Sequence, residues 1–184
     1  MVAAKNKFAI VAQASRLHQK HLSFRPLFGK WVELRNILYK NARRAGLPKK
    51  IVNNMMARPT LNAGVFAIKN KTPHWERFRY WQDVVLQNNP ARIFTATQLA
   101  LGIGVYEEDL PYESLPDICN YMGPHRWDES RQKFVDYFAP YDEVSIVHMV
   151  AQDEMRINPS YKIAIPDIND NTVKKSLRYS ERLS

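Results

Sequence analysis

The chain has 184 residues, 45% of them apolar, which is enough to bury one sizeable core in a single domain. No stretch approaches the roughly 18 uninterrupted apolar residues of a membrane helix, and no signal-peptide core is present, so the sequence predicts a cytoplasmic protein. The single cysteine, Cys119, excludes an internal disulfide and a cysteine-rich zinc site.

The formal net charge of +9 is concentrated in the first quarter of the chain. Residues 1–50 hold twelve Lys or Arg and a single acid, Glu33, so this segment carries +11 and the remainder sums to −2. A positive field of this kind attracts phosphate-bearing partners, whether nucleic acid, anionic lipid or a nucleotide diphosphate. A solvated basic helix face has the same composition, so charge alone selects no partner.

The N-terminal quarter predicts a strand, a loop and a helix. Residues 7–14 form a short apolar run with β-branched residues, typical of a strand, and the polar residues 15–25 follow as a loop. Pro26 begins a helix that Gly46 ends. Its apolar stripe is formed by Leu27, Trp31, Leu34 and Leu38, and basic residues occupy the opposite face.

The middle of the chain predicts one more strand and two helices. Residues 61–69 are apolar, but Asn62 and Gly64 interrupt them, which indicates a close approach to the backbone there. A helix begins at Pro73 and ends near Asn88. Residues 95–104 predict a short helix that Thr95 caps, with Gln98 completing a capping box.

The second half predicts fewer regular elements. Residues 107–123 are acidic and rich in turn formers and indicate a surface loop, while Asp128 caps a predicted helix through residue 138. Residues 144–150 predict a strand. Strands alternating with helices favour an α/β fold with helices packed on a small mixed sheet. We expect one domain over residues 1–166 and a polar tail over residues 167–184.

Several features occur in one order: the strand NAGVFAIK, an aromatic helix, the run TATQLALG, a Leu-Pro loop with Asn120, and a strand ending in VHM. This order resembles the C-terminal half of GT-A glycosyltransferases, which include glycogenin-like nucleotide-sugar transferases. The resemblance covers residues 62–156 and implies a partial GT-A-like layer. It also implies transfer of a sugar from a nucleotide-sugar donor to a sugar or protein acceptor.

The resemblance assigns roles on the donor side of the site. It places Asn62 and Gly64 beside the donor sugar and Asn120 among the substrate contacts, while a β-bulge or a tight strand entry is the structural alternative for the first two. Gln98 matches the family's glutamine and is the candidate catalytic residue. Its place in a capping box is a complete alternative explanation.

The resemblance also implies a divalent cation, Mn²⁺ or Mg²⁺, because His148 matches the histidine that binds the cation beside the diphosphate in metal-dependent members. A core histidine with a satisfied hydrogen bond is the alternative. Arg156 would replace the lysine that holds phosphate in the family. Arg156 therefore joins the candidate substrate contacts.

The chain departs from the family pattern at two places. Thr97 stands where the family has aspartate beside Gln98. No Asp occurs in residues 1–82, so the Asp-x-Asp motif that holds the metal is missing upstream. With only three predicted strands, this favours a fragment truncated upstream that transfers sugar poorly by itself, and a noncatalytic scaffold stays open.

A nucleic-acid-binding protein is the alternative class. The basic first 50 residues would supply phosphate contacts, and Phe24, Phe28 and Trp31 would supply stacking surfaces. The aromatic residues of the helix that begins at Pro26 fall on its apolar stripe, where they are more often core, and the sequence contains no recognisable nucleic-acid module. We therefore expect nucleic acid to bind only nonspecifically and with a steep dependence on salt.

Overall fold

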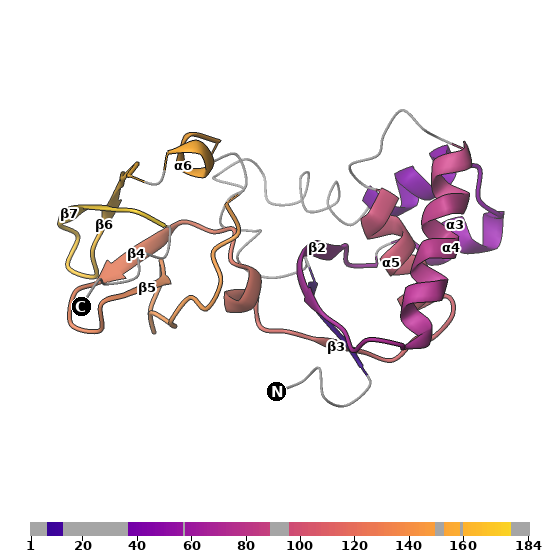
Figure 1. The fold of residues 1–184 in the computed structure, drawn as a ribbon, viewed down its shortest axis with the longest axis horizontal. Coiled ribbons are helices and arrows are strands. Elements are labelled where there is room, and N and C mark those ends of the chain that lie inside the picture. The colour runs from indigo at the N-terminus through magenta and orange to yellow at the C-terminus, as the bar shows by residue number, and fades with distance from the viewer. Residues whose placement is uncertain are drawn as a thin grey trace. The chain divides into compact units, whose positions relative to one another are not determined.

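The structure is a computed structural model that describes residues 7–12, 37–56, 58–88, 96–149, 153–158 and 160–177. Its internal contacts divide the chain into two compact units, Met1–Asp117 and Ile118–Ser184, where the sequence predicts a single domain over residues 1–166. Helices and small sheets together make this a mixed α/β protein, as expected from the sequence (Figure 1).

The sheet of the first unit has three strands in the order β2-β1-β3. The central strand β1 (Phe8–Ala12) pairs antiparallel with β2 (Leu61–Ala67) and parallel with β3 (Tyr112–Ser114). Its apolar sequence FAIVA suits a strand that is buried on both faces. The predicted strands at residues 7–14 and 61–69 are confirmed, while β3 forms inside the predicted loop.

Helices pack on this sheet and on one another. Residues 37–44 are helical, as predicted, and the earlier part of that predicted helix lies outside the described residues. A short helix, α3 (Lys49–Asn54), follows it, and then α4 (Pro73–Asn88) and α5 (Ala96–Tyr106). The last two confirm the predicted helices and lie against each other (Figure 1).

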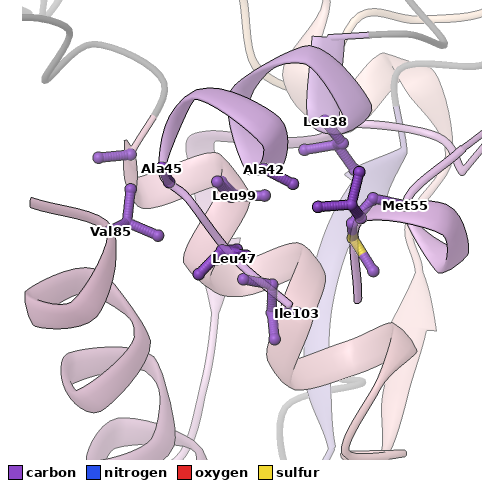
Figure 2. Packing of buried hydrophobic residues seen from close by; sticks show 10 residues of the cluster. Leu38, Ala42, Ala45, Leu47, Met55, Val85, Leu99 and Ile103 are labelled. Carbon is purple, nitrogen blue, oxygen red and sulfur yellow. The ribbon is translucent and has the colours of Figure 1, made fainter. Parts of the chain in front are cut away.

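Two apolar clusters hold the first unit together. The first joins the helix at residues 37–44 to α5, where Leu38 and Ala42 lie with Leu99, Ile103 and Met55 (Figure 2). The second joins α4 and α5 to the sheet and contains Phe8, Ile10, Leu61, Phe78, Leu101 and Val105. Burying each large apolar side chain contributes roughly 1.5–3 kcal/mol, so these two clusters are the main source of stability in this unit.

The second unit is built from two β-hairpins. In one, β4 (His125–Asp128) pairs antiparallel with β5 (Lys133–Asp136), and in the other β6 (Ile163–Pro166) pairs with β7 (Thr172–Lys175). A 3₁₀ helix, η3 (Asp117–Asn120), precedes them, and α6 (Asp153–Ile157) lies between them in the sequence. The tail that the sequence predicts from residue 167 thus includes a paired strand.

The helix predicted over residues 128–138 is wrong, because Asp128 caps a hairpin turn instead. Its carboxylate accepts hydrogen bonds from the Ser130 hydroxyl at 2.6 Å and from the Arg131 backbone N–H at 3.1 Å. Gln132 then takes a positive φ of 53°, which turns the chain back into β5. Asp serves helix caps and tight turns through the same local hydrogen bonds, so the residue alone does not distinguish them.

The strand predicted over residues 144–150 is also wrong in the described part, 144–149. Only one isolated bridge forms there, between Val147 and Tyr121. The amide groups of Ser145 and Ile146 both donate to the carbonyl of Ile118, and the Ile146 side chain is 44% exposed. β-branched residues favour a pleated, half-buried surface, and here no continuous ladder provides one.

Arg126 joins the two hairpins of the second unit. Its guanidinium donates to the carbonyl of Tyr137 at 2.9 Å, to the carbonyl of Asp167 at 2.7 Å and to the Asp170 carboxylate at 2.6 Å. The side chain is itself buried. A charged side chain with several donors can satisfy buried carbonyls from two hairpins at once.

None of the described helices is long and apolar enough to span a membrane.

Candidate functional site

Asn62 and Gly64 lie in an irregular part of β2. Ile10 on β1 pairs with Phe66 on β2, and Ala12 pairs with Leu61. Between these two pairings β2 has more residues than β1, so β2 is bulged there. The Asn62 side chain is 1% exposed, and its Oδ1 accepts a hydrogen bond from the Gly64 N–H at 3.0 Å. The structural alternative for these two residues is therefore present: Asn62 stabilises the bulge.

Gln98 occupies the third position of α5 and is half-buried. Its predicted partner in a capping box, Thr95, lies outside the described residues. Leu101, one turn further along the helix, packs in the same cluster as Leu61, which directly precedes Asn62. The first turns of α5 are thereby anchored to the beginning of β2, and Gln98 belongs to the same unit as Asn62.

Asn120 and His148 are brought together within the second unit. The Tyr121 N–H donates to the Ile146 carbonyl at 2.9 Å, and the His148 N–H donates to the Tyr121 carbonyl at 2.9 Å. This is a short parallel pairing of two extended segments. Asn120, which is 2% exposed, ends η3 directly before the paired Tyr121. The two candidates thus flank one pair of backbone hydrogen bonds.

The surroundings of His148 favour a neutral imidazole. The side chain is half-buried, and its Nδ1 is enclosed and makes no hydrogen bond within the described part of the chain. Burial lowers the pKa of His148 below its usual value, because the charged ring loses hydration that nothing nearby replaces. A neutral ring keeps a nitrogen lone pair that can accept a proton, a hydrogen bond or a metal ion.

The remaining expected contacts are Arg156, for phosphate, and the ligands of a divalent cation beside His148. Arg156 lies on α6, a helix of five residues. Among the residues that the structure describes, no group of three His, Cys, Asp or Glu side chains is arranged to hold a metal ion. His148 would therefore supply one ligand to a divalent cation, which is fewer than a protein-held cation needs.

The six candidate residues are divided between the two units. Asn62, Gly64 and Gln98 belong to the first unit. Asn120, His148 and Arg156 belong to the second. Within the second unit, two backbone hydrogen bonds of Tyr121 join the segment of Asn120 to the segment of His148. This pairing places a buried amide and a neutral imidazole on adjacent segments.

Sequence reasoning missed a cationic surface on the β6–β7 hairpin. The β-branched residues Ile163, Ile165 and Val173 stand at alternate strand positions on either side of the turn-forming run DINDN. That alternation is typical of a hairpin with one buried face, and it would have placed Lys162 and Lys174 together on the other face. No known protein family, curated protein or solved structure shows a significant match to the chain.

Proposed function

We propose that the chain is part of a GT-A-like glycosyltransferase that takes a sugar from a nucleotide-sugar donor. The observation that carries this proposal is the pairing of the segment at Asn120 with the segment that ends at His148. The resemblance relates these two residues through their order in the sequence, while the pairing relates them in space.

In this proposal the neutral ring of His148 binds on the diphosphate side of the donor, and the buried Asn120 lies on the segment that pairs with that of His148. Mn²⁺ or Mg²⁺, if bound, would neutralise the diphosphate charge as the leaving group departs. His148 would supply one ligand to that cation. Because the described residues do not complete a ligand set, we derive no catalytic step through the metal.

The test is an NMR titration of the full chain with UDP-glucose, first alone and then with substoichiometric Mn²⁺. We expect shifts at His148 and at residues 120–121, and selective broadening of the same signals by the paramagnetic ion. A His148→Ala variant should lose both effects. The matched control is Asn158→Ala, an exposed residue of the same unit that should keep them.

Two results would contradict the proposal. In one, UDP-glucose leaves the signals of residues 120–121 and 148 unchanged at millimolar concentration. In the other, Mn²⁺ broadens all exposed carboxylate regions equally, and His148→Ala makes no difference. Retained folding of each variant is checked by its NMR spectrum, so a loss of response is not mistaken for unfolding.

A second candidate function, nucleic-acid binding, is favoured by the exposed basic residues Lys40, Arg43 and Arg44 on the helix at residues 37–44. They lie opposite the buried Leu38 and Ala42. We expect this face to bind oligonucleotides weakly, with an affinity that falls steeply as salt is added. Submicromolar, sequence-selective binding without any response to UDP-glucose would favour this second function over the first.

A further inference from the structure

A groove of about 670 Å³ runs along the second unit, between the β4–β5 and β6–β7 hairpins and the segment at residues 144–147. Its volume lies within the roughly 300–1,000 Å³ that small-molecule sites occupy. None of the six candidate residues discussed above lines it. The side chains that decide its chemistry are four lysines and two aromatic residues: Lys133, Lys162, Lys174, Lys175, Trp127 and Phe134.

Two of the lysines already have partners. The Lys133 ammonium lies 2.9 Å from the Glu143 carboxylate, and Glu143 also lines the groove. The Lys175 ammonium lies 3.9 Å from the centre of the Trp127 ring and 3.5 Å from the Glu129 carboxylate. Both lysines thus line the groove with their charge already engaged.

The other two lysines lack an acidic partner among the described residues. Lys162 and Lys174 are both exposed. The register pairs Ala164 with Lys174, so Lys162 and Lys174 lie on the same face of the hairpin as diagonal neighbours. Diagonal neighbours have Cβ atoms about 7–8 Å apart, within reach of two long side chains. Two ammonium groups at this spacing repel each other until an anion lies between them.

The aromatic residues do not provide a stacking platform. Trp127 is 8% exposed, and Lys175 covers one face of its ring. Phe134 packs edge-on against both Trp127 and His125. Ser145 and Ser176 also line the groove and add hydroxyl groups. Recognition here rests on ammonium and hydroxyl groups rather than on base stacking, which favours phosphate oxygens over a nucleobase.

We propose that this groove binds a ligand that carries at least two phosphoryl groups. A single phosphate would fill only a small part of the groove, whereas a diphosphate can approach Lys162, Lys174 and the serine hydroxyls together. The proposal does not depend on sugar transfer, because it uses none of the residues assigned to the donor. Nucleotides and inorganic polyphosphates share this chemistry.

The experiment titrates the full chain with pyrophosphate and, separately, with inorganic phosphate, at physiological ionic strength. We expect NMR shifts at Lys162, Lys174 and Ser145, and an affinity about tenfold higher for pyrophosphate than for phosphate. The double variant Lys162→Gln/Lys174→Gln should weaken pyrophosphate binding about tenfold or more. The double variant Lys162→Arg/Lys174→Arg keeps both charges and should retain binding.

A matched control separates the groove from the general positive field of the chain. Lys49→Gln/Lys50→Gln removes the same charge from exposed positions in the first unit and should leave pyrophosphate binding within about twofold. Equal weakening by both glutamine pairs would overturn the proposal. So would an absence of shifts in the groove, or binding of a single-stranded oligonucleotide with no binding of pyrophosphate. ADP binding as well as pyrophosphate would identify nucleotides as one source of the phosphoryl groups.

Discussion

In the first unit, two clusters of apolar side chains fill the space between the helices and the sheet. Its buried polar residues, among those described, are Thr60, Asn62 and His74. The second unit buries four charged residues and one amide: Arg126, Asp128, Asp136, Asp167 and Asn120. The larger unit thus depends on apolar area, and the smaller one depends more on hydrogen bonds.

The difference follows from the elements that each unit contains. Helices of 11 and 16 residues present whole apolar faces, while strands of four residues present two inward side chains each. A small hairpin unit cannot bury enough apolar surface by itself, so polar contacts must fix its turns and its register. Substitutions that remove one kind of contact should therefore affect the two units differently.

The largest effect is expected from Leu99→Ala in the first unit. Leu99 lies on α5 and is fully buried against the helix at residues 37–44 (Figure 2). Truncating a buried leucine leaves a cavity and should lower the free energy of unfolding by about 3 kcal/mol. Amide hydrogen exchange should speed up in β1 and α5 far more than in β4 and β5. Equal acceleration in both units would show that they unfold as one.

A slightly smaller effect is expected from Arg126→Leu in the second unit. The change keeps an apolar stem but leaves the carbonyls of Tyr137 and Asp167 without their donor. Buried groups without partners should lower the free energy of unfolding by about 2–3 kcal/mol, and amide exchange should show the loss in β4 and β6. Arg126→Lys keeps the charge but not the forked geometry, so it should recover only part of the loss. An unchanged stability would show that apolar packing dominates here too.

The sequence predicts the first unit well because its helices are long and carry period-3.6 apolar patterns with clear beginnings. Pro73 begins α4 as predicted, and the apolar run at residues 61–69 contains β2. In the second unit the local signals were ambiguous. Asp128 suits a helix cap and a hairpin turn alike, and residues 144–149 have strand composition but form only an isolated bridge in the described part of the chain.

The candidate site could be predicted only in part. The order of Asn120 and His148 in the sequence led to two residues that the structure brings together. Composition could not reveal that the Asn62 side-chain oxygen accepts a hydrogen bond from Gly64 within the bulge, because a bulge depends on the register with a strand about 50 residues away. Lys174 was missed because the polar residues from 167 onward resemble an unstructured tail, and Lys162 was missed because no strand was predicted over residues 163–166.

A smaller effect, which separates packing from helix propensity, is expected at two glycines of α5. A Cβ at position 104 would lie 2.8 Å from the ring of Phe78 on α4, whereas a Cβ at position 102 would lie 3.3 Å from the flexible end of Leu38. Alanine adds roughly 1 kcal/mol of helix propensity at either site. We expect Gly104→Ala to lower the free energy of unfolding by about 1–2 kcal/mol, because the cost of overpacking exceeds the gain in helix propensity. Gly102→Ala should change stability little in urea denaturation, and an equal loss from both substitutions would contradict this account.

Acid should lower the stability of the second unit gradually as the pH falls. Hydrogen bonds from Ser130 and then Arg131 lower the pKa of Asp128 to about 2, and a side-chain hydrogen bond from Asn171 lowers the pKa of Asp167. An unfolded aspartate titrates near 3.9, so the stability that these carboxylates contribute is complete above about pH 4 and is lost as the pH falls toward 2. In the described part of the first unit only Glu108, beside Arg77, has its pKa lowered in the same way.

Amide exchange between pH 5 and pH 2, corrected for the intrinsic rate, should therefore lose protection in β4 and β5 before β1. Asp128→Asn should flatten that dependence, whereas Asp83→Asn, on the exposed face of α4, should not. Earlier loss in β1 would reverse the comparison, because it would make the apolar unit the one that carries the acid sensitivity.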